Sequence, residues 1–171
     1  MAEQKLFASH NDYSSLQTQA GGTDIEHRFG WCAAASALWC KSMLDASVAP
    51  KDSDPSKLRA GILQVKFRWD SPFGGENVSN LFGHLELRAD PACAGVSLAE
   101  LFDSVFGTPG VYWISNYGHA MGVDTRAGRL LFYDIEEGLF QYATAEEMRE
   151  GIRSRYRRQP VWRAFRAAPR A

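Results

Sequence analysis

Cysteine is scarce in this chain, and long apolar runs are absent from it. The 171 residues include only Cys32, Cys40 and Cys93, and no two of them form a CxxC pair. An odd count without paired spacing argues against a disulfide framework and against a structural zinc site. No apolar run approaches the ~20 residues that cross a bilayer, so we expect no integral membrane segment.

Net charge is also nearly absent, at −1 for pH 7. Without a net positive field, nothing attracts the whole molecule to nucleic acid or to an anionic membrane, and we expect no nucleic-acid partner. The 45% hydrophobic and 23% charged content is ordinary for a globular protein. We expect a flexible polar leader over residues 1–24 and a single domain over residues 25–171, present as a monomer.

The predicted elements begin with helices and continue with strands. Residue patterns predict helices over residues 31–45, 57–67, 77–82 and 98–106, then strands over residues 111–115, 120–124, 130–134 and 139–142. A helix over residues 144–156 and a final strand over residues 160–165, at a sheet edge, complete the chain. Ser97 and Thr144 each open a capping box. This order predicts an α+β fold, with an N-terminal helical half packed on an antiparallel sheet half.

One helix start stands out as a site for chemistry. In Gly30-Trp31-Cys32, Gly30 allows a tight turn and the alanines that follow favour helix, so Cys32 should occupy the first helical turn. Unpaired backbone N–H groups and the helix dipole stabilise a thiolate there. We interpret Cys32 as a candidate nucleophile; a small buried residue in an Ala-rich helix is the alternative.

A histidine and an aspartate stand in register on two successive predicted strands. His119 begins one strand and Asp134 ends the next, and pairing about a turn at Ala127-Gly128 sets them opposite each other, roughly 5 Å apart. A carboxylate beside an imidazole favours the imidazolium, which in turn holds a nearby thiol as thiolate. With Cys32, these residues make a candidate nucleophilic triad.

Three blocks of the sequence resemble a known family. The stretch Gly30-Trp31-Cys32 with Leu38-Trp39 resembles the nucleophile helix of the YopT/AvrPphB-type cysteine proteases, peptidase family C58. Residues 118–124 are similar to the histidine strand of that family, and residues 132–140 are similar to its aspartate segment. The blocks also occur in the family's order.

The resemblance implies a papain-like fold and a thiol protease that cleaves peptide bonds. Cys32 would be the nucleophile, His119 the general base and acid, and Asp134 the residue that orients His119. Family members are bacterial virulence effectors, so the resemblance implies a protein made in the bacterial cytoplasm and secreted by type III secretion into the host cytoplasm. Its substrate would be a protein or peptide, such as a host signalling protein.

Other residues are candidates for supporting roles. Papain-like enzymes usually place an amide side chain a few residues before the cysteine to help hold the oxyanion. Residues 24–28 carry no amide, so His27 is the candidate donor here and Arg28 the alternative. Trp31, Trp113 and Asn116 are candidates for a substrate groove; core packing is the alternative for the two tryptophans, and a simple turn is the alternative for Asn116. No set of residues reaches the ligand count of a metal site, and the chemistry needs no cofactor.

Two alternatives remain open. An NlpC/P60-like peptidoglycan amidase also pairs a cysteine helix with a histidine strand, but it commonly orients the histidine with a second histidine or a polar residue. A catalytically degenerate papain-like module would bind a partner through the same cleft, and the missing upstream amide favours it. Asp134, in register with His119, favours the protease over the amidase.

Overall fold

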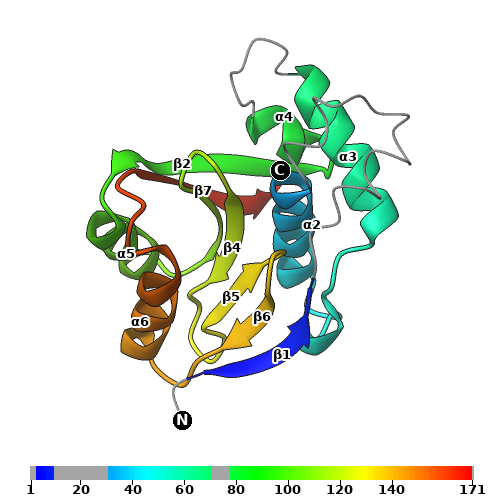
Figure 1. Ribbon diagram of the computed structural model, residues 1–171. Coiled ribbons are helices and arrows are strands. Elements are labelled where there is room, and N and C mark those ends of the chain that lie inside the picture. Colours follow the sequence, from blue (N-terminus) through cyan, green and yellow to red (C-terminus); the bar gives the residue numbers. More distant parts are fainter. Residues whose placement is uncertain (1–2, 10–30, 71–77, 171) are drawn as a thin grey trace.

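The computed structural model describes residues 3–9, 31–70 and 78–170, which form one antiparallel sheet with helices on both faces (Figure 1). Its seven strands follow the order β1-β6-β5-β4-β3-β7-β2. Neighbouring strands are antiparallel throughout. The strands are β1 (Gln4–Ala8), β2 (Leu87–Val96), β3 (Val111–Ser115), β4 (Ala120–Asp124), β5 (Leu131–Asp134), β6 (Gly138–Gln141) and β7 (Trp162–Pro169).

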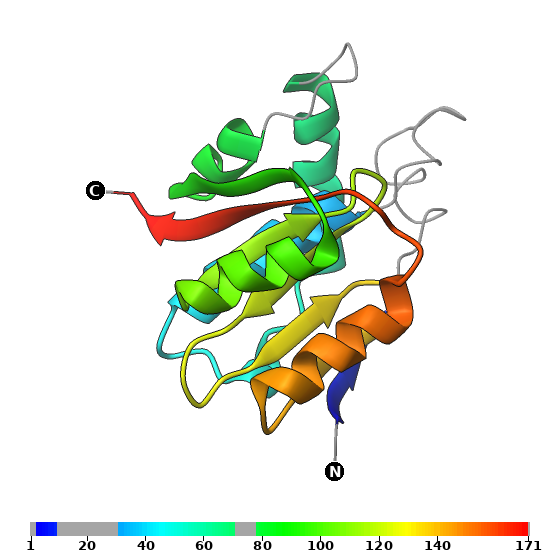
Figure 2. The same cartoon turned by 90° about the vertical axis from the view of Figure 1, so that its left-hand side faces the viewer.

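The helices divide between the two faces of the sheet. Helix α2 (Cys32–Leu44) lies on one face, and α5 (Leu98–Gly107) and α6 (Ala145–Tyr156) lie on the other (Figure 2). The short helix η2 (Pro50–Asp52) follows α2, and α3 (Lys57–Asp70) and α4 (Val78–Gly83) pack on the α2 side. Each face therefore buries its own apolar cluster.

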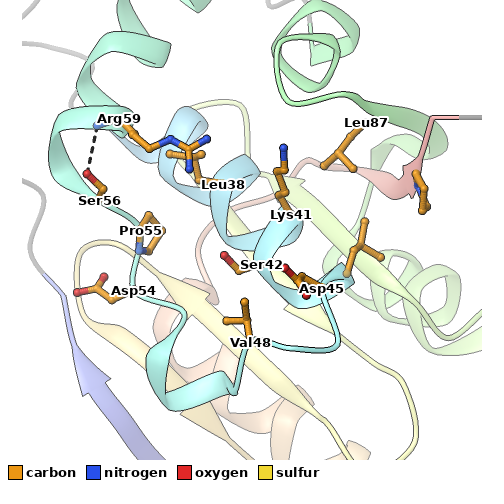
Figure 3. A pocket seen from close by; sticks show the side chains of 12 residues that line it. Leu38, Lys41, Ser42, Asp45, Val48, Asp54, Pro55, Ser56, Arg59 and Leu87 are labelled. Atoms are coloured by element: carbon orange, nitrogen blue, oxygen red, sulfur yellow. Dashed lines mark hydrogen bonds between the residues drawn. The ribbon is translucent and has the colours of Figure 1, made fainter.

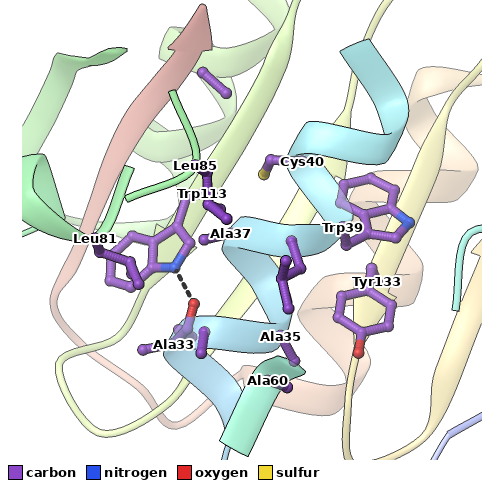
Figure 4. Packing of buried hydrophobic residues seen from close by; sticks show 14 of the residues in the cluster. Ala33, Ala35, Ala37, Trp39, Cys40, Ala60, Leu81, Leu85, Trp113 and Tyr133 are labelled. Atoms are coloured by element: carbon purple, nitrogen blue, oxygen red, sulfur yellow. Dashed lines mark hydrogen bonds between the residues drawn. The ribbon is translucent and has the colours of Figure 1, made fainter. Parts of the chain in front are cut away.

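The α2 face is organised by large aromatic rings on both sides of the helix (Figure 4). The Trp39 indole stacks on the Tyr133 ring of β5, with centroids 5.6 Å apart and planes 10° apart. Gly122 of β4 lies beneath the indole, where any Cβ would come within 2.3 Å of Trp39 Cε3. On the other side, Trp113 Nε1 donates to the Ala33 carbonyl at 3.1 Å. These contacts fix α2 against the sheet, and with it the position of its first residue.

The fold confirms most of the predicted elements and the α+β arrangement. The helices and strands predicted from residue 31 onward lie within a few residues of their observed bounds. Both capping boxes begin helices: Ser97 Oγ accepts from the Glu100 N–H, and Thr144 Oγ1 accepts from the Glu147 N–H. No helix in residues 3–9, 31–70 and 78–170 is both long and apolar enough to cross a membrane.

Two predictions about strands were wrong. Residues 4–8, which we expected to belong to a flexible leader, form β1 and pair with β6, because Leu6 and Phe7 pack against the α2-side cluster. The rest of that segment, from residue 10 to residue 24, lies outside the described residues, so the division into leader and domain stays a prediction. The last strand, β7, is not an edge strand, because β2 pairs along its outer side.

Candidate active site

Cys32 is the first residue of α2 and so lies in the first helical turn, where the sequence predicts it. The Ala35 N–H donates to the Trp31 carbonyl at 2.9 Å, and the Ala34 N–H donates to Gln64 Oε1 of α3 at 3.0 Å. The first N–H groups of an α-helix find no carbonyl inside the helix, and with the dipole they favour negative charge at this end. The partly exposed Cys32 thiol therefore lies at the positive end of the α2 dipole.

His119 ends the loop that joins β3 to β4, and Asn116 holds that loop. The Asn116 Oδ1 atom accepts from the Gly118 N–H at 3.0 Å and from the His119 N–H at 2.8 Å. Between them, Tyr117 adopts a left-handed backbone (φ 69°), and its N–H donates to Ser115 Oγ at 2.9 Å. These bonds fix the backbone that carries the imidazole.

Asp134 is the last residue of β5 and is fully buried. Its Oδ1 atom lies 2.7 Å from His119 Nε2 and accepts from the Glu136 N–H at 3.0 Å. The predicted register was off by one residue: Gly122 pairs with Tyr133, so His119 and Asp134 are diagonal rather than directly opposite. They still meet, because diagonal neighbours share a sheet face and the imidazole is long enough to reach.

The imidazole of His119 lies between a carboxylate and a thiol. Burial by itself lowers the His119 pKa, but hydrogen bonds and charge contacts with Asp134 and Cys32 outweigh it and raise this pKa from 6.5 to about 10. Burial likewise opposes the charge of Asp134, but the bonds from His119, Tyr156 and Glu136 keep the pKa of Asp134 below 3.8. The structure thus brings Cys32, His119 and Asp134 together, with an imidazolium and a carboxylate at neutral pH.

Tyr156, which the sequence reasoning missed, also belongs to this cluster. Its hydroxyl donates to Asp134 Oδ2, and its ring stacks on the His119 imidazole with centroids 6.2 Å apart. Burial and the neighbouring Asp134 raise the Tyr156 pKa, so the phenol remains a donor. The sequence predicts a helix that ends at Tyr156, but nothing in a helical pattern shows that its last side chain turns towards a distant strand.

The structure tests some of the supporting residues predicted for the groove and the oxyanion hole. Trp31 and Trp113 were wrong as groove residues, because both indoles are almost fully buried in the core. Asn116 is half-buried and uses its side-chain oxygen to hold the His119 loop. His27 lies outside the described residues, so its role as oxyanion donor stays a prediction. Among the residues that the structure describes, no cluster of three or more His, Cys, Asp or Glu side chains could hold a metal ion.

A cavity of about 470 Å³ lies away from Cys32, along the C-terminal half of α2 and the start of α3 (Figure 3). Leu38 and Lys41 line it from α2, Asp45 from the position just after α2, and Arg59 from α3. None of the three predicted triad residues borders it. This cavity is therefore separate from the candidate active site.

The comparisons with known proteins support the fold. No family model matches this sequence, and no curated protein matches it either. Among solved structures, the chain is similar to the Pseudomonas avirulence protein AvrPphB, with a TM-score of 0.58 and 15% identity over 81% of this chain and 91% of that chain. The likeness, at this low identity, shows a shared fold, and the α+β, papain-like fold class predicted from the sequence is confirmed.

Proposed function

We propose that this protein is a cysteine peptidase that cleaves peptide bonds with Cys32, His119 and Asp134. One observation carries the proposal: the His119 imidazole contacts the Cys32 side chain while its Nε2 lies 2.7 Å from the buried Asp134 carboxylate. An imidazolium beside a thiol favours the thiolate, and the thiolate is the nucleophilic form of cysteine. The likeness to AvrPphB and the three sequence motifs support the same function.

The reaction begins with attack of the Cys32 thiolate on the scissile carbonyl carbon. The carbonyl π electrons move to oxygen, and the Cys32 N–H at the start of α2, together with one upstream donor, stabilises that oxyanion. The His119 imidazolium gives its proton to the leaving amine as the C–N bond breaks, which leaves an acyl-thioester on Cys32. Neutral His119 then takes a proton from water, the hydroxide attacks the thioester, and the thiolate leaves.

Asp134 serves this cycle without changing its own protonation. Its lowered pKa keeps the carboxylate charged at neutral pH, and its bond to His119 Nε2 fixes the tautomer of the neutral ring. A charged carboxylate in this position favours the peptidase over an NlpC/P60-like amidase. The contacts of His119 with both Cys32 and Asp134 favour an enzyme over a degenerate binding module.

We also propose that the substrate is a host protein that this peptidase meets after bacterial export. Under this proposal the chain is made in the bacterial cytoplasm, leaves by type III secretion as a monomer and acts as a virulence effector in the host cytoplasm. The motifs of the C58 type and the likeness to an avirulence protein support it. Translocation of a reporter fusion into host cells, compared between a wild-type strain and a strain without the secretion apparatus, tests this route.

The peptidase activity itself is tested with a denatured-proteome peptide library and mass spectrometry. New N-termini should accumulate with the wild type and with Cys93→Ser, and should be absent with Cys32→Ala. Cys93 is a suitable control because it lies on the edge strand β2, with β7 and β3 between that strand and β4. Release of amines from peptidoglycan instead would establish the amidase. If the folded wild-type protein cleaves neither the peptides nor peptidoglycan, both enzymatic functions are overturned and the binding module is favoured.

A further inference from the structure

We infer that Tyr156 is a positioning residue of the active site, one that keeps Asp134 charged and in a single orientation for His119. The inference rests on the proposed function, because it assigns Tyr156 a role in that same site. Tyr156 is the last residue of α6 and comes from the side of the sheet opposite α2. The site would therefore draw on both layers of helices.

The hydrogen bonds of the Asp134 carboxylate divide between its two oxygens. Oδ1 contacts His119 Nε2 at 2.7 Å and the Glu136 N–H at 3.0 Å, while Oδ2 accepts from the Tyr156 hydroxyl. Rotation of the carboxylate would break bonds on both oxygens together. Without the phenol, Oδ2 would lose the side-chain donor that opposes such a rotation, and the angle at which Oδ1 meets His119 would be less well defined.

The Tyr156 ring is itself held in place. It stacks on the His119 imidazole with 27° between the planes, and it meets the Trp162 indole edge-on, with centroids 5.8 Å apart. Trp162 is fully buried, and its Nε1 donates to the Gln159 carbonyl at 3.0 Å. A ring fixed by two neighbours places its hydroxyl with little freedom, which is what a positioning role requires.

The hydroxyl, together with His119, also favours the charged form of the carboxylate. A hydrogen bond to the charged form of an acid favours that form, so loss of the donor must raise the pKa of Asp134. Burial works in the same direction, because it opposes charge on Asp134. The Tyr156→Phe variant should therefore move the acid-side titration of Asp134 to higher pH, and a purely structural role for the ring would leave that titration unchanged.

The test compares Tyr156→Phe with Tyr112→Phe, by NMR of ¹³C-labelled aspartate carboxyls and histidine rings. Tyr112 is the control because its hydroxyl likewise donates to an acceptor oxygen, the Thr108 carbonyl, apart from Asp134; Tyr112 is fully buried and Tyr156 half-buried. We expect the Asp134 midpoint to rise by about one pH unit in Tyr156→Phe, a tenfold change in proton affinity, and to stay in place in Tyr112→Phe. Asp134→Asn assigns the resonance.

Failure of this inference is distinguishable from failure of the proposed function. A wild-type His119 that titrates near 6.5 would contradict the charged site and hence the proposed function. A wild-type His119 with a raised pKa, combined with an Asp134 midpoint that both Phe variants leave unchanged, would overturn the role of Tyr156 alone.

A second measurement, on the wild type, covers the case in which Tyr156→Phe does not fold. The Tyr156 ¹³Cζ resonance should show no ionisation up to about pH 11, because the phenol donates to a carboxylate. Ionisation at the ordinary tyrosine value of about 10 would mean that the hydrogen bond is absent, and the inference would fail.

Discussion

Asp134 is the residue on which the charge of the candidate site depends. In Asp134→Asn, burial still opposes the imidazolium but the carboxylate no longer offsets it, so the His119 pKa should fall well below its native value of about 10. We expect peptidase turnover to fall on the order of 10⁴-fold, as it does when the aspartate of a serine-protease triad is replaced by asparagine. Histidine NMR titration measures the pKa of His119. Turnover of a peptide that the wild type cleaves in the library experiment measures the loss of activity.

Asp124→Asn is the matched control for that prediction. Asp124 is another fully buried aspartate, at the end of β4, and its partner is Arg126 at 2.7 Å rather than a histidine. The Asp124→Asn substitution should lower the free energy of unfolding and leave the pKa of His119 unchanged. Equal shifts of the His119 titration in both variants would contradict a specific role for Asp134.

Gly122 is the residue that allows α2 to approach the sheet. A methyl group there would fall 2.3 Å from Trp39 Cε3 and 2.6 Å from Cζ3, and the ring cannot retreat because Tyr133 stacks on it. Gly122→Ala should therefore lower the free energy of unfolding by at least about 2 kcal/mol and slow alkylation of Cys32, which α2 carries.

The control for Gly122 is Gly107→Ala, at the last position of α5. A Cβ there meets nothing within 4 Å, so the substitution should be neutral or stabilise the protein by up to about 1 kcal/mol. Urea unfolding gives both values. Similar losses in the two variants would mean that backbone flexibility, rather than the contact with Trp39, explains the glycine.

At the scale of whole elements, Arg155 of α6 joins β1 to the turn that follows Asp134. Its guanidinium makes two bonds of 2.8 Å to Glu3, one of 2.6 Å to Glu137, and lies over the Phe140 ring. We expect Arg155→Ala to cost about 1–3 kcal/mol of stability, because the network is partly buried. Amide hydrogen exchange in β1 should accelerate as well.

Arg153 provides the comparison for this network, two residues away on the same helix. Its ion pair with Glu150 is exposed, so Arg153→Ala should cost no more than about 0.5 kcal/mol and leave β1 unchanged. If β1 exchanges at the native rate in Arg155→Ala, the Arg155 network does not hold that strand.

The sequence predicts elements well where the signal is local, and poorly where it depends on a distant partner. The capping boxes at Ser97 and Thr144 and the turn after β4 are local signals, and each matches the structure. The β1 strand is only five residues long, and it forms because Leu6 and Phe7 pack against the α2-side cluster while β6 pairs with it. The contact of Tyr156 with Asp134 depends likewise on how α6 packs, which periodicity does not record.

At the scale of the molecule, the charged pair makes stability depend on pH. The pKa of His119 in the folded protein lies above 6.5. Its contribution to the free energy of unfolding is therefore complete below pH 6.5 and is lost as the pH rises towards 10. The folded Asp134 pKa lies below 3.8, so its contribution is present above pH 3.8 and is lost below it. The wild type should therefore exceed Asp134→Asn in stability most strongly between about pH 4 and 6.5.

The difference in free energy of unfolding between the wild type and Asp134→Asn should be on the order of 3 kcal/mol and should shrink steadily between pH 6.5 and 10. Denaturant unfolding of the two proteins at several pH values provides the measurement, with Asp124→Asn as reference. A difference that does not vary with pH would show that the pair is uncharged in the folded protein.

The burial of Cys40 allows the fraction of folded molecules in a sample to be measured by alkylation. Cys40 of α2 is fully buried in the apolar cluster on that side of the sheet. Cys32, at the start of the same helix, is partly exposed. In a Cys93→Ser background, an intact molecule should take up one alkyl group, and a molecule that has lost its fold should take up two. Counting adducts by mass therefore reports, molecule by molecule, how many copies in a preparation are assembled, before any substrate has been identified.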